Sequence, residues 1–333
     1  MKITRVAVLG AGSWGATLAD LLGRKGLDVR LWDAHAEPLE RLREERHPFG
    51  IPELRLSEGV RLCDDIEAAM RGSDAALLAC PAQALDSLAA RIAALPGSSH
   101  PASLVVVAKG IEVSTGRLPA EVLSAHLPLP LAVLSGPCIA REVAKGVPTS
   151  AVAASAHGKL ATAVQEACMT ARFRIYTHDD VVGVELGGAL KNVVAIAAGA
   201  TDGLGFGDNT KAALVCRGLA EMTRLAGALG AQQRTLAGLA GLGDLTVTCF
   251  SPHSRNRTFG ECLAKGESAA AIVDRLGQVV EGVPTARAAV ELAMKHGVEV
   301  PIMSAVHHLC TGRLTAVQAL DQLMNRDPKP EFA

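Results

Sequence analysis

The sequence of 333 residues predicts an α/β domain with a doubly wound, mostly parallel sheet over residues 1–185, followed by an all-α domain over residues 186–333. Three observations support this prediction. Strand-like and helix-like runs alternate through the first half of the chain, a pattern typical of parallel α/β folds. A glycine-rich turn directly follows the first strand-like run. After residue 181 no convincing alternating strand pattern occurs, and segments rich in Ala and Leu replace it.

The first expected strand, Ile3–Leu9, is short and apolar, and it leads into a glycine turn and then a helix-like run. Gly10 permits the tight turn, Gly12 lets the backbone approach a pyrophosphate, and Gly15 lets the helix pack closely on the strand. The start of that helix would offer free N–H groups and the positive end of its dipole to the phosphates. The glycine spacing alone is weak support, because 33 of the 333 residues are glycine. Its place between a strand and a helix predicts a Rossmann-like, dinucleotide-binding domain.

The second expected strand, Val29–Trp32, ends at Asp33, which lies 18 residues beyond Gly15. An acidic residue at about this distance from the glycine turn is expected to bind the ribose hydroxyls of the adenosine half of a dinucleotide. The alternative is that Asp33 simply ends a strand.

Two later turns are expected on the ligand side of the sheet. Ligands bind outside the carboxyl ends of parallel strands, and Lys109 and the turn Ser135–Cys138 each follow a strand-like run. Lys109 has the alternative of a solvated strand end. The further strand-like runs are Ala75–Ala79, Leu104–Ala108, Ala132–Leu134, Ser150–Ala154 and Arg172–Tyr176, with helix-like runs at Gln83–Leu95 and Gly158–Thr170 between some of them.

Residues 181–200 form an apolar stretch whose polar side chains are Glu185, Lys191 and Asn192. A lysine and a glutamate near its centre would each cost about 2.5–3.5 kcal/mol in a bilayer, so we expect a tightly packed core helix and no stable membrane insertion. An unpaired buried charge is very costly. Lys191 therefore either forms a structural ion pair with Glu185 or another acid, or serves a site where burial lowers its pKa for proton transfer.

The second domain is expected to hold helices near residues 210–230, 269–276, 284–296 and 314–324. Between them, residues 238–257 are rich in glycine and polar groups. Asp244 and Thr248 are four residues apart, so on a helix they share a face. Ser254, Arg255 and Asn256 bring together a hydroxyl, a guanidinium and an amide, and arginine can hold a phosphate through two N–H groups. The alternative is a solvated surface loop.

Composition excludes several classes of protein. The net charge is −1 with both signs interspersed, which argues against a nucleic-acid surface. The eight cysteines show neither C-x-x-C nor zinc spacing, which predicts free thiols and no metal site. The N-terminal residues do not resemble a signal peptide, so we expect a cytoplasmic protein. The apolar second domain leads us to expect a homodimer.

Seven motifs in the same order resemble bacterial NAD(P)-dependent glycerol-3-phosphate dehydrogenase, and the resemblance covers essentially the whole chain. They are GAGSWG near the N-terminus, VAKGIE at 107–112, SGP at 135–137, ELGGALKN at 185–192, GLGDL at 241–245, SRNR at 254–257 and EGVPTA at 281–286. ELGGALKN, and GLGDL followed by SRNR, are the specific ones; the glycine turn is shared with other dinucleotide-binding proteins.

The resemblance implies reversible reduction of dihydroxyacetone phosphate to sn-glycerol 3-phosphate with NADH or NADPH, for glycerophospholipid synthesis. It implies that Lys191 is the catalytic lysine. Positions that match substrate contacts are Lys109, Gly136, Cys138, Asp244, Ser254, Arg255 and Asn256, and positions that match cofactor contacts are Ser13, Trp14, Lys109, Ala140, Arg255, Val279 and Glu281. Asp244 is expected to hold Lys191 or a substrate hydroxyl in position, assisted by Thr248, and Arg255 with Asn256 is expected to bind the phosphate.

Three positions depart from the family pattern. Cys138 stands where relatives usually have Ser or Thr, so a hydroxyl contact is missing or replaced by a weak thiol. Ala34 stands where relatives often carry His or Arg near the adenosine ribose. Pro284 interrupts a segment that is usually EGVRTA.

Two other functions are compatible with the general architecture. One is a related two-domain NAD(P)-dependent dehydrogenase for a hydroxy acid, against which GLGDL followed by SRNR argues. The other is a protein that senses NAD(H) without turnover, which has no need of a lysine in an apolar helix.

Overall fold

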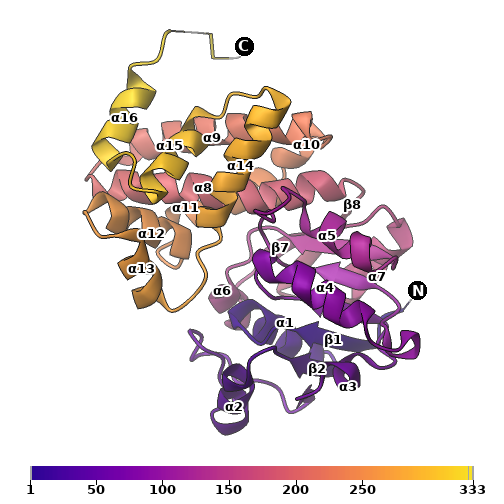
Figure 1. Ribbon diagram of the computed structural model, residues 1–333. Coiled ribbons are helices and arrows are strands. Elements are labelled where there is room, and N and C mark those ends of the chain that lie inside the picture. The colour runs from indigo at the N-terminus through magenta and orange to yellow at the C-terminus, as the bar shows by residue number, and fades with distance from the viewer. Residues whose placement is uncertain (1, 329, 332–333) are drawn as a thin grey trace.

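The computed structural model describes residues 2–328 and 330–331, and it contains a sheet domain followed by a helical domain (Figure 1). The sheet order is β3-β2-β1-β4-β5-β6-β7-β8, and all neighbouring strands are parallel except β6 and β7. The strands are β1 (Arg5–Leu9), β2 (Asp28–Trp32), β3 (Val60–Leu62), β4 (Ala75–Leu78), β5 (Leu104–Val106), β6 (Leu131–Ser135), β7 (Thr149–Ala154) and β8 (Phe173–His178). The predicted doubly wound, mostly parallel sheet is confirmed. Each predicted strand begins and ends within two residues of an observed one.

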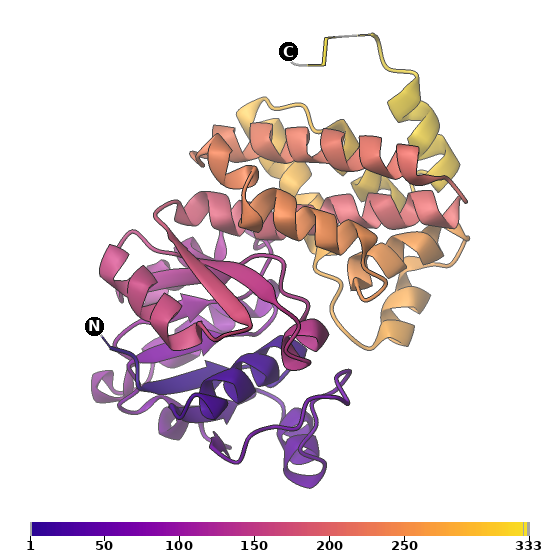
Figure 2. The same cartoon turned by 180° about the vertical axis from the view of Figure 1, so that it is seen from behind.

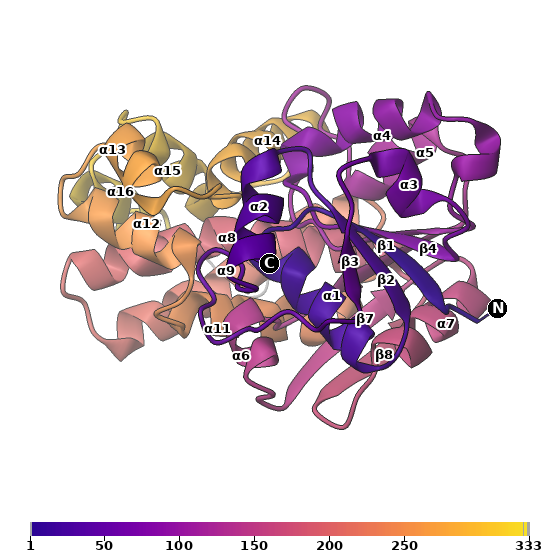
Figure 3. The ribbon, with the colours of Figure 1, turned by 90° about the horizontal axis from the view of Figure 1, so that it is seen from below.

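Helices cover both faces of this sheet, with α3, α4 and α5 on one face and α1 and α7 on the other (Figure 3). Alternate residues of β1 show that both faces of the sheet are apolar and need a covering layer. Val6 and Val8 pack in a core with α1 and α7, whereas Ala7 and Leu9 pack in a second core with α3, α4 and α5. The helical elements of this domain are α1 (Ser13–Arg24), α2 (Ala36–Glu44), α3 (Ile66–Met70), η1 (Ala82–Ala84), α4 (Leu85–Ala93), η2 (Gly97–Ser99), α5 (Pro119–His126), α6 (Ala140–Ala144) and α7 (Gly158–Cys168).

The glycine turn lies where the strand order reverses, because β2 and β4 flank β1 on opposite sides and follow it in the chain. Gly10 has φ +119°, and a Cβ there would lie 2.8 Å from the backbone of Ala79. A Cβ on Gly15 would lie 1.9 Å from the carbonyl oxygen of Gly10. Both positions therefore require glycine, and the turn lies at the switch point of the sheet, where such folds bind ligands.

The helical domain is built around α8 (Val181–Gly203), a 23-residue helix that crosses its middle (Figures 1 and 2). The other elements are α9 (Asp208–Ala228), α10 (Gln233–Leu236), η3 (Leu239–Gly243), α11 (Asp244–Phe250), α12 (Arg255–Ala264), α13 (Ala269–Leu276), α14 (Gly282–His296), α15 (Pro301–Cys310) and α16 (Ala316–Met324). No strand occurs after β8 among the described residues, so the predicted all-α second domain is confirmed.

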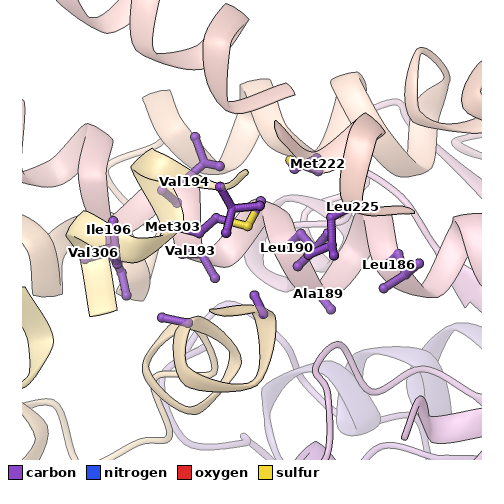
Figure 4. Packing of buried hydrophobic residues seen from close by; sticks show 14 of the residues in the cluster. Leu186, Ala189, Leu190, Val193, Val194, Ile196, Met222, Leu225, Met303 and Val306 are labelled. Atoms are coloured by element: carbon purple, nitrogen blue, oxygen red, sulfur yellow. The ribbon is translucent and has the colours of Figure 1, made fainter. Parts of the chain in front are cut away.

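Helix α8 carries apolar side chains around its whole circumference, as a helix must when other elements surround it. Leu186, Leu190 and Val193 pack with side chains of α9, α14 and α15 (Figure 4). By length and composition this helix is long enough to cross a membrane, but 83% of its most apolar window is buried inside the protein. Its small residues also allow close approach: a Cβ on Gly199 would lie 1.8 Å from the carbonyl oxygen of Arg257 on α12. The expected tightly packed core helix is therefore confirmed.

The proposed domain boundary between residues 185 and 186 falls within α8. Val184 packs with the core of the sheet domain, whereas Leu186 packs with the core of the helical domain. We propose that the boundary lies at this change of core, although the helix itself is continuous. Residues 1, 329, 332 and 333 of the proposed domain ranges lie outside the described residues.

One departure from the family pattern is accommodated without distortion. Pro284 is the third residue of α14, and the first turn of a helix tolerates proline because its N–H groups have no partner within the helix. The change from EGVRTA to EGVPTA thus leaves the helix intact.

Candidate active site

Lys109, Lys191 and Asp244, together called the lysine–aspartate cluster, meet where the sheet domain faces the helical domain. Lys109 follows β5, Lys191 lies on α8, and Asp244 is the first residue of α11. The Nζ of Lys109 lies 2.7 Å from Oδ2 of Asp244, and the Nζ of Lys191 lies 2.9 Å from Oδ1 of the same carboxylate. One carboxylate thus joins two ammonium groups from different domains.

Two further contacts hold the lysines in place. Lys191 donates to Oγ1 of Thr248 at 2.7 Å, and Thr248 in turn donates to the carbonyl oxygen of Asp244 at 2.6 Å, one helical turn earlier. Lys109 donates to the carbonyl oxygen of Gly136 at 2.9 Å. The expectations that Asp244 and Thr248 share a helical face, and that the turns at Lys109 and Gly136 lie together on the ligand side, are confirmed.

A glycine-rich π-helical turn, η3, brings Asp244 to this place. A Cβ on Gly241 would lie 2.0 Å from the carbonyl oxygen of Leu236, and a Cβ on Gly187 of α8 would lie 2.5 Å from that of Ala240. Gly241 therefore lets the turn close against the end of α10, and Gly187 lets it lie against α8. Single π-turns within helices are frequent at functional sites, and this one points the first residue of α11 at Lys191.

Burial and charge give the two lysines different acidities. Burial lowers the pKa of Lys191 to about 8; the charge of Asp244 raises it again only in part, and the charge of Lys109 lowers it further. Burial also acts against the charge of Lys109, but Asp244 outweighs it and the pKa of Lys109 is raised. Lys109 therefore keeps its charge near neutral pH, whereas Lys191 can give up and regain a proton. Such a divergence marks an acid–base pair with separate roles.

Glu185 is not the partner of Lys191. Its Oε1 accepts from the N–H of Ala120 at the start of α5, at 2.8 Å, and burial raises its pKa to about 8. The alternative predicted from the sequence was an ion pair of Lys191 with Glu185 or another acid; the pair with Glu185 does not form, and the acid is Asp244.

The start of α1 fits the phosphates of a dinucleotide. No side chain caps this helix, and the position of a Cβ on Gly12 has no heavy atom within 4 Å, so the turn is open at this point. Its neighbour Ser13 donates to the carbonyl oxygen of Phe49 at 2.9 Å. Trp14 turns away from the open turn and packs edge-on against Phe173, with ring centroids 6.4 Å apart.

Asp33 is placed beside the glycine turn, as its position after β2 requires. Its Oδ2 accepts from the N–H of Ala11 at 2.6 Å, and its Oδ1 accepts from the N–H of His35 at 2.9 Å. The carboxylate thus steadies the turn, and its contact with a ribose stays a prediction. Ala34 beside it is exposed and leaves the surrounding space open.

Glu281, which directly precedes α14 of the helical domain, reaches the sheet domain next to β4. Its Oε1 accepts from the N–H of Ala82, just beyond β4, at 3.1 Å, while its buried Oε2 has no hydrogen-bond partner among the described residues. Arg255 donates to the carbonyl oxygen of Val279, in the same loop, at 2.9 Å. An unpartnered buried carboxylate oxygen can accept a hydrogen bond from a bound cofactor. Glu281 of the helical domain and the glycine turn of the sheet domain therefore both fit a dinucleotide.

Ser254 and Asn256 are engaged within the protein. Ser254 caps α12 by accepting from the N–H of Arg257. Asn256 donates to the side chain of Asn192, next to Lys191, at 2.8 Å and accepts from the N–H of Gly282 at 2.9 Å. Arg255, between them in the sequence, is exposed as a residue, and burial of its guanidinium lowers the pKa of that group. A phosphate contact by these residues stays a prediction, with Arg255 the most accessible of the group.

Two other predicted residues line the turn after β6. Cys138 is half-buried, and burial raises the pKa of its thiol to about 12, so the thiol is neutral and a weak donor. Ala140 begins α6 and packs on the small cluster around Ala16 of α1. Ser135 and Gly188 also lie here. Ser135 belongs to the turn expected on the ligand side and Gly188 to the expected core helix, but sequence reasoning gave neither of them a role at the site. The only signal was their place inside the motifs SGP and ELGGALKN.

The chain matches two family models along most of its length. The model described as NAD-dependent glycerol-3-phosphate dehydrogenase N-terminus matches residues 5–161, and the model for the C-terminus matches residues 180–321.

Proteins similar to this chain carry the name of that family. Glycerol-3-phosphate dehydrogenase [NAD(P)+] of Geobacter sulfurreducens is 48% identical over 98% of this chain and 98% of the relative. The corresponding protein of Anaeromyxobacter dehalogenans is 48% identical over 98% of this chain and 100% of its own length. The crystal structure of glycerol-3-phosphate dehydrogenase from Coxiella burnetii superposes with a TM-score of 0.93 at 38% identity, covering 98% of this chain and 99% of that one.

Proposed function

The chain belongs to the NAD-dependent glycerol-3-phosphate dehydrogenase family, and on this premise we propose how its residues reduce dihydroxyacetone phosphate reversibly to sn-glycerol 3-phosphate. The observation that carries the proposal is the single buried carboxylate of Asp244 between Lys109 and Lys191. The product is the backbone precursor of glycerophospholipids, and we assign the enzyme to their synthesis in the cytoplasm.

Lys191 is the acid of the reduction. Bound NADH or NADPH would supply the hydride to the carbonyl carbon, which leaves negative charge on the carbonyl oxygen for the residues of this chain to neutralise. Lys191 gives that oxygen its Nζ proton, and in the reverse reaction the neutral amine removes the proton from the hydroxyl. A pKa lowered to about 8 by burial suits both directions near neutral pH.

Lys109 and Asp244 prepare the site for this transfer. Lys109 remains protonated and, as a fixed cation, stabilises the developing alkoxide. Asp244 keeps the two like charges together before substrate binds, and Thr248 accepts one N–H of Lys191 so that its remaining protons point elsewhere. The cluster carries a net charge of about +1 when both lysines are protonated, which favours a phosphorylated substrate.

We assign the substrate phosphate chiefly to Arg255, aided by Ser254 and Asn256. Arg255 uses one N–H on the carbonyl oxygen of Val279, and a planar guanidinium can still hold two phosphate oxygens with its other donors. We assign the cofactor pyrophosphate to the glycine turn from Gly10 to Gly15 and the adenosine ribose to Asp33. The family accepts both nicotinamide cofactors, and we propose that both work here with some preference for NADH, because a carboxylate repels a 2′-phosphate.

The decisive test of the function is NADH oxidation by the purified chain with dihydroxyacetone phosphate. Rapid turnover is expected with this substrate, and slow turnover with unphosphorylated dihydroxyacetone or with 2-keto acids. Faster reduction of a keto acid would favour a hydroxy-acid dehydrogenase. NADH binding without oxidation of any substrate would favour a sensing protein.

We also propose that the chain forms a homodimer through a groove of about 770 Å³ between α8, α9, α15 and α16. Its floor is apolar, with Leu204, Leu214 and Leu309, and both Phe206 and Met324 are exposed beside it. Its rim carries both signs of charge, from Arg217, Arg224, Arg326, Asp327 and Glu331. A surface with both signs can pair with itself across a two-fold axis, so the occupant is a second copy of the chain.

Light scattering tests this surface. Met324 is 75% exposed, so Met324→Glu should not disturb the fold of one chain, but it should shift the mass of the particle from dimer to monomer. Met294→Glu is the control, because Met294 is 78% exposed on α14 and does not line the groove. An unchanged mass for Met324→Glu, or a monomeric wild type, would show that the groove is not the interface.

A further inference from the structure

Ser135 carries a buried hydroxyl that nothing within the protein satisfies. It is the last residue of β6 and is 3% exposed, and its Oγ has no hydrogen-bond partner among the described residues. Buried polar side chains nearly always have a partner, and those that lack one are often found to meet a ligand or a water. The position of this hydroxyl therefore indicates what it binds.

The hydroxyl points at the backbone of α8 within the active site. A Cβ on Gly188 would lie 2.7 Å from Oγ of Ser135 and 3.4 Å from Cγ of Lys109. Gly188 is three residues before Lys191, so the two share one face of α8. The residue after Ser135, Gly136, accepts from Lys109 through its carbonyl oxygen. Ser135 thus lies against Gly188, one turn of α8 before Lys191, and a side chain at position 188 would press on its hydroxyl.

We propose that Ser135 is a substrate-binding residue whose hydroxyl pairs with the C1 hydroxyl of dihydroxyacetone phosphate; this inference rests on the proposed function. The substrate has three polar groups. We assign the carbonyl oxygen to contacts with Lys191 and Lys109, and the charged phosphate to a contact with Arg255. The C1 hydroxyl remains, and like the hydroxyl of serine it can both donate and accept hydrogen bonds, so the two can pair.

Lys109 lies on the same side of Gly188 as Ser135. The Oγ of Ser135 and the Cγ of Lys109 lie 2.7 Å and 3.4 Å from the position of a Cβ on Gly188, and the ammonium group of Lys109 donates to Asp244 at 2.7 Å. A substrate whose carbonyl oxygen meets Lys109 and Lys191 would therefore bring its C1 hydroxyl close to Ser135.

The test compares dihydroxyacetone phosphate with hydroxyacetone phosphate, in which hydrogen replaces the C1 hydroxyl. The wild type should prefer the natural substrate in kcat/KM by about 10-fold or more, because a site built for a hydroxyl rejects an analogue that lacks it. Ser135→Ala should lose about 10-fold with dihydroxyacetone phosphate and stay within about twofold with the analogue. The preference for the C1 hydroxyl should therefore disappear.

Gly188→Ala provides an independent second variant. Its methyl group would occupy the point 2.7 Å from Oγ of Ser135, so the preference should fall although the serine is intact. Ser103→Ala is the control: Ser103 is 0% exposed and donates to the carbonyl oxygen of Asp74 at 2.8 Å, away from the site. This variant should melt at a lower temperature and keep the wild-type preference.

The outcomes separate this inference from the proposed function. An equal loss with both substrates in Ser135→Ala, or a preference that Gly188→Ala leaves unchanged, would overturn the role of Ser135. A wild type that reduces neither phosphorylated substrate would instead overturn the proposed function, and a wild type with no preference would show that the C1 hydroxyl is bound nowhere.

Discussion

Replacement of Lys191 by methionine separates a catalytic lysine from a structural one. Methionine keeps the length and apolar packing of the side chain in α8 but removes the proton and the charge. We expect turnover to fall by about 10²–10⁴-fold, the usual contribution of a positioned acid. Binding of NADH should survive, because Lys191 lies in the helical domain and the glycine turn lies in the sheet domain.

The structure also sets the expected change in stability. Removal of one partner from a buried ion pair commonly costs about 3–5 kcal/mol, because the other charge is left alone. Here Asp244 keeps Lys109 at 2.7 Å, so its charge is not left unpaired. Loss of Lys191 should therefore cost less than this range in the free energy of unfolding, and relief of repulsion between the two ammonium groups should reduce the cost further.

A matched control exists on α9. Lys211 is also a buried lysine that pairs with an aspartate, Asp202, and Asp202 keeps Arg257 at 2.6 Å when Lys211 is removed. Steady-state NADH oxidation and thermal melting should be measured for Lys191→Met and Lys211→Met. We expect Lys211→Met to melt lower than wild type with near-normal turnover per folded molecule. The same result for Lys191→Met would refute the argument, because it would make Lys191 half of a structural ion pair.

Three further predictions address other groups of the protein. Arg255→Lys keeps the charge but loses the planar guanidinium, and Arg255→Ala loses both, so kcat/KM for dihydroxyacetone phosphate should fall in the order Arg, Lys, Ala. Activity with unphosphorylated dihydroxyacetone should hardly change. Equal losses with both substrates would make Arg255 a cofactor or structural residue. Asp33→Ser should raise kcat/KM for NADPH relative to NADH, and no change in that ratio would show that the carboxylate only steadies the glycine turn. Burial raises the pKa of Glu185 to about 8. Between the ordinary pKa of a glutamate and about pH 8, the folded protein therefore holds a proton that the unfolded chain has released. The free energy of unfolding should decrease as the pH rises through this range. Glu185→Gln should remove this decline, by a few kcal/mol in urea unfolding between pH 5 and pH 8.5, and an unchanged pH dependence would count against a neutral buried Glu185.

Local sequence patterns were sufficient to predict most of the sheet domain. Gly15 is required by close approach to the backbone of Gly10, five residues earlier, and the spacing of these glycines between a strand and a helix is visible in the sequence itself. The strand β3 was missed because Val60–Leu62 is too short, and is interrupted by Arg61, to show a periodic pattern. Helix α15 was missed as well. It begins at Pro301, so its start coincides with a residue that usually marks a break.

The partners of the site residues depend on tertiary packing and could not be predicted from the same patterns. Lys109 and Asp244 are 135 residues apart and meet only because the two domains pack together. The periodicity of α8 identified Lys191 as a buried charge, but it offered Glu185 on the same helix as readily as Asp244. The unpartnered hydroxyl of Ser135 likewise becomes visible only when the backbone of Gly188 lies against it.

The pH dependence of kcat/KM for dihydroxyacetone phosphate tests most directly the claim that Lys191 is the proton donor. Burial lowers the pKa of Lys191 to about 8, and the reduction requires its protonated form, so activity should decline with loss of one proton as the pH rises through about 8. The small activity left in Lys191→Met should lack this decline. A profile that is flat between pH 7 and pH 9, or the same decline in Lys191→Met, would contradict the assignment of the acid to Lys191.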